Sequence, residues 1–282
     1  MNIFEELRFY LQFTFVQYAI IVAILTAVCA ALIGVPLVLK RYSFAGFALS
    51  NVAFLATAVA IVINLTNNLL FVMPLTVLAS VLLIGFNSRF KLRGDATLAM
   101  LAVGTLALGY FIINTFAMHG NITADVTSSL FGATSILTLQ LSDVLISLGV
   151  TILVVAFFVF FHHRIFAVTF DTEFLQATGA RPFVYEILLA AIIGVVVALS
   201  MQLVGSLLTA ALIIFPALSS MQLFKTFKAV TIYSSALAAL CALLGVLSAI
   251  ILETPVGTTI ILINILAFSI LYIIGQVKKK LA

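Results

Sequence analysis

Apolar runs of about 20 residues recur along the whole chain, and each is long enough to cross the hydrocarbon core of a bilayer as an α-helix. With 65% hydrophobic and 8% charged residues, the sequence predicts an all-α polytopic membrane protein. A β-barrel would need alternating apolar and polar positions, whereas these runs are continuous. The expected spans are 16–39, 47–64, 69–87, 96–117, 142–161, 184–200, 203–223, 228–252 and 257–277.

The number of spans depends on how the region 184–223 is divided. It holds about 40 residues with no charge after Glu186, enough for two short helices that turn near 200–205. We therefore expect eight to nine transmembrane helices. No linker or repeat divides the chain, so residues 1–282 form one transmembrane domain.

The basic residues predict the orientation, because the cytoplasmic loops of membrane proteins are enriched in Lys and Arg. If nine spans are drawn, 12 of the 13 basic residues fall on one side of the membrane. The N-terminus should then lie outside and the C-terminus inside. The stretch 162–182, HHRIFAVTFDTEFLQATGARP, is placed in the cytoplasm.

This cytoplasmic stretch carries the start and stop signals of a short helix. Asp171 is a good N-cap, residues 172–178 make about two turns, Gly179 supplies a left-handed C-cap, and Pro182 prevents continuation. The alternative is an ordinary polar loop.

The faces of this predicted helix differ in polarity. Phe170 and Phe174 fall on one side, while Asp171, Glu173 and Gln176 remain in water. Such a helix suits the membrane surface or the groove of a partner protein.

The segment 119–141 is too polar at its start for a clean crossing, and Gly132 interrupts it. A re-entrant helix here would point to a translocation path, because non-helical backbone at membrane depth must be buried or line a wet cavity. The other interpretation is an outer loop. A single histidine, His119, lies at its start with no role that the sequence defines.

Several functions are excluded by missing motifs. The chain has neither a GxxxxGK[ST] loop nor an HExxH motif, so neither nucleotide hydrolysis nor zinc-dependent proteolysis is expected of it. Cys29 and Cys241 lie inside apolar runs as packing residues. The net charge of +4 comes from helix ends, so no nucleic-acid partner is expected.

Five motifs stand in the order and spacing of one known family. The chain resembles the permease subunit of bacterial ABC importers for zinc and manganese over nearly its whole length. The motifs are LVLKRYSFAGFALSN (37–51), SLFG (129–132), FDTEFLQATGARP (170–182), VGSLLTAALIIFPALSS (204–220) and ETPVGTTIILI (253–263).

The resemblance implies a multi-pass protein of the bacterial cytoplasmic membrane that is not itself an enzyme. It implies three partners besides lipid: cytoplasmic ATPase subunits that hold ATP and Mg²⁺, an external solute-binding protein, and a second permease, identical or paralogous. The segment 164–183 would carry the coupling helix, with Asp171, Glu173, Phe174 and Gly179 as its functional residues. Pro216, within a span, favours a kink that could serve gating, although packing also explains it.

The chain departs from the resemblance at its expected cargo path, which comprises Phe47, Ser50 and Asn51. Permeases of this family typically have an Asp and a His four residues apart, where this chain has Phe47 and Asn51. Phe47 cannot bind a metal and the amide of Asn51 is neutral, so no metal ligand or bound cofactor is expected in this chain.

Three hypotheses follow. The chain is a subunit of a metal importer whose path is hydrated or whose ligands come from a different permease. It has the same architecture but carries a metal chelate or another small organic molecule. Or it is a secondary transporter or structural membrane subunit without an ATPase.

Overall fold

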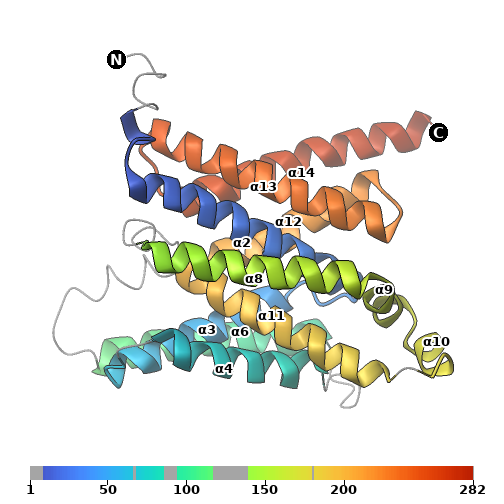
Figure 1. The fold of residues 1–282 in the computed structure, drawn as a ribbon, viewed down its shortest axis with the longest axis horizontal. Coiled ribbons are helices and arrows are strands. Elements are labelled where there is room, and N and C mark those ends of the chain that lie inside the picture. The colour runs from blue at the N-terminus through green and yellow to red at the C-terminus, as the bar shows by residue number, and fades with distance from the viewer. Residues whose placement is uncertain (1–8, 66–67, 86–93, 117–138, 180, 282) are drawn as a thin grey trace.

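Helices account for all the regular structure that the computed structural model describes, which covers residues 9–65, 68–85, 94–116, 139–179 and 181–281 (Figure 1). The all-α fold predicted from composition is confirmed. In chain order the elements are α2 (Thr14–Leu39), α3 (Ala45–Val62), α4 (Asn68–Ser80), the π-helical turn η1 (Val81–Gly85), α6 (Gly94–Phe116), α8 (Leu141–Phe160), α9 (His162–Phe170), α10 (Thr172–Ala177), α11 (Pro182–Val204), α12 (Ser206–Leu223), α13 (Phe227–Leu252) and α14 (Val256–Leu281).

Within these ranges, eight helices are long and apolar enough to cross a membrane, and Asn68–Ile84 is a shorter apolar helix. Together they coincide with the nine predicted runs. The predicted segment 119–141 lies almost wholly outside the described residues.

The bundle is built around α2, which packs against α8, α12 and α13. Small residues such as Ala27, Ala30 and Ala31 are fully buried along it. A Cβ added at Gly34 would overlap the backbone carbonyl of Ile213 in α12. Since lipid provides no hydrophobic force between helices, close backbone contact of this kind stabilises the bundle through van der Waals packing.

Two tight turns reverse the chain. Gly205 adopts φ +96° between the end of α11 at Val204 and the start of α12 at Ser206. This turn lies within the predicted range 200–205. Between α2 and α3 the amide of Tyr42 donates to the carbonyl of Leu37, and that of Arg41 to Val38. This is the Schellman pattern, with Arg41 at φ +63° in the position that glycine usually takes.

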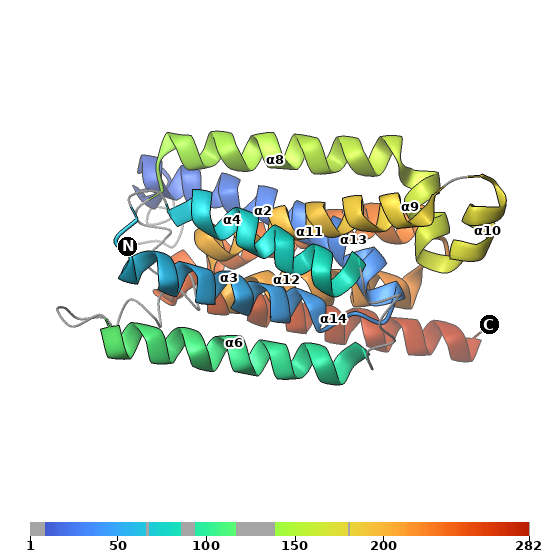
Figure 2. The same ribbon diagram turned by 90° about the horizontal axis from the view of Figure 1, so that it is seen from below.

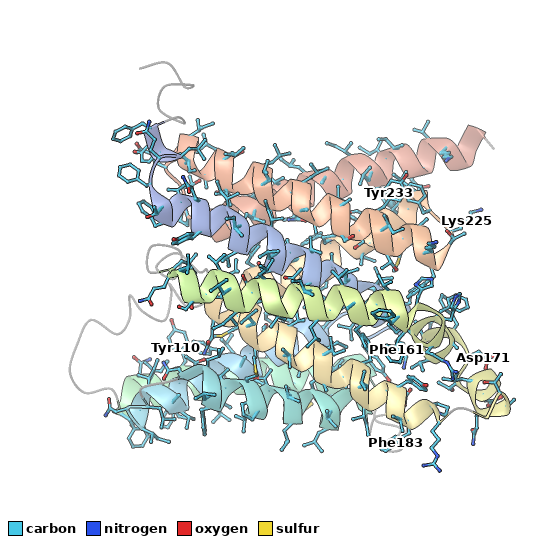
Figure 3. All side chains as sticks on the ribbon, viewed as in Figure 1. Tyr110, Phe161, Asp171, Phe183, Lys225 and Tyr233 are labelled. Carbon is cyan, nitrogen blue, oxygen red and sulfur yellow. The ribbon has the colours of Figure 1, made fainter. Side chains whose placement is uncertain are left out.

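One end of the bundle, called here the α10 end, holds α9, α10, the α2–α3 link and the C-terminal end of α14 (Figure 1). Asp171 and Lys225 both lie there, as Figure 3 shows. The helices α6 and α8 run along opposite sides of the bundle, and α10 projects beyond both (Figure 2). This arrangement brings the described basic loops to one end, as the positive-inside interpretation requires.

Candidate translocation path and coupling segment

The first candidate feature is an apolar groove that contains Phe47. Its cavity of about 410 Å³ is formed by α3, α12 and α14. Phe44, just before α3, and Phe47 of α3 line it together with Phe215 of α12 and Ile265 of α14. The Phe44 and Phe47 rings meet edge to face, with centroids 6.3 Å apart. The groove can therefore hold an apolar surface, and it offers little to a bare cation.

The neighbouring candidates Ser50 and Asn51 face the interior of the chain instead. Both are buried, at 0% and 1% exposure. The Ser50 hydroxyl donates to the Phe47 carbonyl at 2.9 Å, and Asn51 Nδ2 donates to the Ala102 carbonyl of α6 at 3.1 Å. Asn51 thus ties α3 to α6 within a single chain, and its expected contact with cargo stays a prediction.

The other amide atom of Asn51 is unusual. Its Oδ1 is buried and accepts no hydrogen bond from the described part of the chain. An unpaired buried carbonyl oxygen is costly, so such groups usually meet water, a ligand or a moving partner. A neutral oxygen of this kind is a hard but weak ligand for a divalent ion.

Pro216 lies in the helix that forms one wall of the groove. It directly follows Phe215, is buried, and α12 continues through it as one helix. Because proline has no amide hydrogen, it cannot donate to the carbonyl of Leu212 one turn earlier. Its neighbour Ser220 donates to the Pro216 carbonyl at 2.9 Å. The predicted gating role of Pro216 remains untested.

The second candidate feature is the coupling segment, defined here as residues 164–183. Helix α10 occupies Thr172–Ala177, close to the predicted 172–178. The Leu175 amide donates to the Asp171 carbonyl at 3.3 Å, which places Asp171 at the N-cap position. Gly179 adopts φ +81°, as the predicted left-handed cap requires. The backbone signals in this segment were therefore interpreted correctly.

The sequence did not predict α9, which precedes α10. Its buried residues Ile165 and Val168 are three apart, and Phe166 and Phe170 are four apart with ring centroids 4.8 Å from each other. This spacing is the helical signal that could have revealed it.

Most of α10 is available to a partner. Leu175 anchors it at 3% exposure, whereas Glu173, Gln176 and Ala177 are exposed. Phe170 is 57% exposed, and the side chain of Phe174 lies outside the described atoms. The arrangement presents one polar helical face beyond the end of the bundle.

A largely buried ion pair lies beside this segment, and no pattern in the sequence indicates that its two members meet. Lys40 Nζ lies 3.0 Å from Glu186 Oε1, with side-chain exposures of 14% and 11%. The pair borders a polar cavity of about 370 Å³ that Arg41, Thr169 and Thr172 also line. Lys40 and Glu186 therefore connect the ends of α2 and α11 beside α9 and α10.

No group of three or more His, Cys, Asp or Glu side chains suited to a metal ion occurs among the described residues. Cys29 and Cys241 are free and buried, and Cys29 Sγ donates to Thr151 Oγ1 at 3.3 Å. Both cysteines therefore serve packing between helices.

The family model and the similar proteins of known name all point to membrane proteins of transport systems. The model of the ABC 3 transport family matches residues 12–275. The manganese import system permease protein of Streptococcus gordonii is 28% identical over 270 residues, covering 96% of this chain and 95% of that protein. The high-affinity zinc uptake system membrane protein of Haemophilus influenzae is 24% identical, over 89% of this chain and 94% of that one.

Solved structures share the fold. PsaBC from Streptococcus pneumoniae in complex with Fab superposes with a TM-score of 0.81 at 24% identity, covering 95% of this chain and 94% of that chain. An inward-facing putative metal-chelate type ABC transporter gives a TM-score of 0.70 at 18% identity, with 90% and 86% covered.

Proposed function

Because this chain belongs to the ABC 3 transport family and is a multi-pass protein of the cell membrane, we propose that it forms the translocation path of an ATP-driven importer. The observation that carries this proposal is α10, a capped helix that projects from the end of the bundle where the described basic loops gather. A channel through the bundle would not need a helix that projects from it. A transporter driven by an ATPase on a separate chain needs a surface through which that ATPase can move it, and α10 offers one.

In this proposal the α10 end faces the cytoplasm, and α10 seats in a groove of an ATPase subunit that holds ATP and Mg²⁺. Glu173 lies on the exposed face and makes the contact, while Gly179 sets the direction in which the chain leaves the helix. Asp171 begins the helix, and Phe174 adds to the contact. Leu175 and the Lys40–Glu186 pair transmit movement of α10 to α2 and α11.

The opposite end receives cargo from an extracytoplasmic solute-binding protein. A second permease, either identical or paralogous, closes the groove at Phe47 from its open side. The outer helices α6 and α14 are poorly buried in the single chain: only 22% and 17% of the residues in their most apolar stretches are buried. Such surfaces are available both to a second copy and to lipid.

The proposed cargo is a divalent transition metal, which the names of the manganese and zinc permeases support. Asn51 Oδ1 is one of four buried side-chain oxygens without a hydrogen-bond partner among the described residues, and a passing ion could meet it. A second candidate is a metal chelate or other small organic molecule. The groove at Phe47 favours this candidate, because its lining is apolar and would not compensate the dehydration of a bare dication.

The test is metal accumulation by cells that lack the gene and are complemented with variants, measured by mass spectrometry of manganese, zinc and iron. Gly179→Val should abolish uptake with an unchanged amount of protein in the membrane, because a β-branched residue does not tolerate φ +81°. Gly179→Asn is the matched control and should retain uptake, since asparagine adopts this conformation and no atom lies within 4 Å of its Cβ.

Three outcomes separate the hypotheses. ATP-dependent uptake of free manganese or zinc supports the metal importer. Uptake only of a chelated metal supports the second candidate. Uptake that survives ATP depletion and is abolished by a protonophore would indicate a secondary transporter and would contradict the proposal.

A further inference from the structure

A second groove lies on the opposite side of α2 from α12, between two helices that both pack on α2 (Figure 1). Its cavity of about 480 Å³ has Val28 and Leu32 of α2 in its floor. Val159 of α8 and Ile232 of α13 stand in its two walls and are 69% and 56% exposed. The apolar part of this groove faces outward from the bundle, at membrane depth.

The groove becomes cationic toward the α10 end. His162, His163 and Lys228 line it there, and no acidic side chain is among its lining residues. The His162 and His163 rings lie with centroids 5.6 Å apart, and His162 also contacts the Phe227 ring at 5.3 Å. Burial lowers the pKa of His162, and the positive charges of His163 and Lys228 lower it further. His162 is therefore mostly uncharged at neutral pH, and Lys228 supplies the fixed positive charge at this end of the groove.

The dimensions match one leaflet of a bilayer. From Lys228 to Ser235 the wall covers seven residue-to-residue steps, or about 10 Å of helix. This distance fits within the half-thickness of the hydrocarbon core, which is about 15 Å. The apolar part of the groove can therefore hold the segment of an acyl chain nearest the headgroup, and the cationic end of the groove then lies at headgroup level.

We propose that this groove binds an anionic phospholipid of the leaflet at the α10 end. Its acyl chain lies between α8 and α13, and its phosphate accepts hydrogen bonds from Lys228 and His163. The charge at the mouth selects an anionic headgroup over a zwitterionic one, since each basic residue near a membrane surface attracts anionic lipid. The site is separate from the groove at Phe47, which lies among α3, α12 and α14, and does not depend on what the chain transports.

The experiment uses the absence of tryptophan from this sequence. Ile232→Trp places a unique fluorophore in the groove wall. Leu153→Trp is the control, because Leu153 of α8 is as exposed as Ile232, at 55%, and does not line the groove. Each variant is reconstituted in vesicles that mix phosphatidylcholine with phosphatidylglycerol, and either lipid is brominated on the same acyl carbons.

Quenching at I232W should show a preference for phosphatidylglycerol of about fivefold, the factor that one basic residue near the surface supplies. At L153W the two lipids should quench equally. Adding Lys228→Gln with His163→Gln to I232W should abolish the preference. Lys225→Gln, which removes an exposed lysine at the same end and outside the groove, should leave it unchanged.

Equal quenching by the two lipids at I232W would overturn the proposal. A preference that survives Lys228→Gln with His163→Gln would overturn the assigned headgroup contacts. Weaker quenching by both lipids at I232W than at L153W would mean that another protein or a second copy fills the groove, and would replace the lipid proposal.

Discussion

The ion pair between Lys40 and Glu186 offers a quantitative test of how the coupling segment is held to the bundle. Glu186→Leu leaves the Lys40 ammonium without the carboxylate that lies 3.0 Å away. Breaking a fully buried pair costs about 3–5 kcal/mol, whereas exposed pairs contribute about 0–1 kcal/mol. The two side chains are 14% and 11% exposed and border a polar cavity. Water can partly solvate the remaining charge, so we expect a loss of about 2–3 kcal/mol in the free energy of unfolding.

The assay is a double-mutant cycle of Lys40→Met, Glu186→Leu and their combination, with unfolding by SDS in mixed micelles followed by circular dichroism. Each single variant should lose about 2–3 kcal/mol, while the double variant should lose less than about 1 kcal/mol, because apolar pairs replace buried ion pairs at little cost. Lys225→Met, at an exposed lysine of the same end, should stay within about 0.5 kcal/mol of the native chain.

A double variant whose loss equals the sum of the two single losses would refute the pairing. Single variants that match the Lys225→Met control would show that the pair contributes nothing to stability.

Three further predictions follow from the packing, the topology and the path. Gly34→Ala should lower the free energy of unfolding by about 1–3 kcal/mol, because the added Cβ would overlap the Ile213 carbonyl. Gly149→Ala should leave it unchanged, because no atom lies within 4 Å of the added Cβ, and equal effects of the two variants would contradict the close contact at Gly34. In a background without Cys29 and Cys241, Thr254→Cys should react with an impermeant thiol reagent in whole cells and Glu173→Cys should not; the reverse pattern would invert the orientation. Phe47→Asp with Asn51→His places two metal-binding side chains one helical turn apart and should create affinity for Mn²⁺, measured by electron paramagnetic resonance, that exceeds that of the native chain. No gain would show that position 51 stays turned toward Ala102 and away from the groove at Phe47.

The positions of the membrane helices and of α10 could be predicted from the sequence because they depend on local properties, whereas α9 was missed. The nine apolar runs, the break at Gly205 and the cap at Gly179 each follow from the length of a run or the conformational freedom of a single residue. The contacts between helices do not shift these helix ends from the positions that the local residues predict.

The rotation of each helix could not be predicted. Helix α3 is apolar all round, so nothing in its periodicity shows that Asn51 faces Ala102 while Phe47 faces a groove. The Lys40–Glu186 pair joins residues 146 positions apart, and only the packing of α2 near α11 brings them together. The candidate site therefore depends on tertiary contacts that spacing in the sequence does not encode.

Cross-linking from Glu173 tests the central claim, that α10 couples this bundle to an ATPase, most directly. The exposed position of Glu173 on α10 allows Glu173→Cys, in the background without native cysteines, to carry a short thiol-reactive cross-linker. When the chain is isolated from its own cells, the adduct should contain an ABC-type ATPase, and its yield should change when ATP is added. Thr254→Cys should give no such adduct. A Glu173→Cys adduct that lacks an ATPase, or contains the external binding protein instead, would contradict the account.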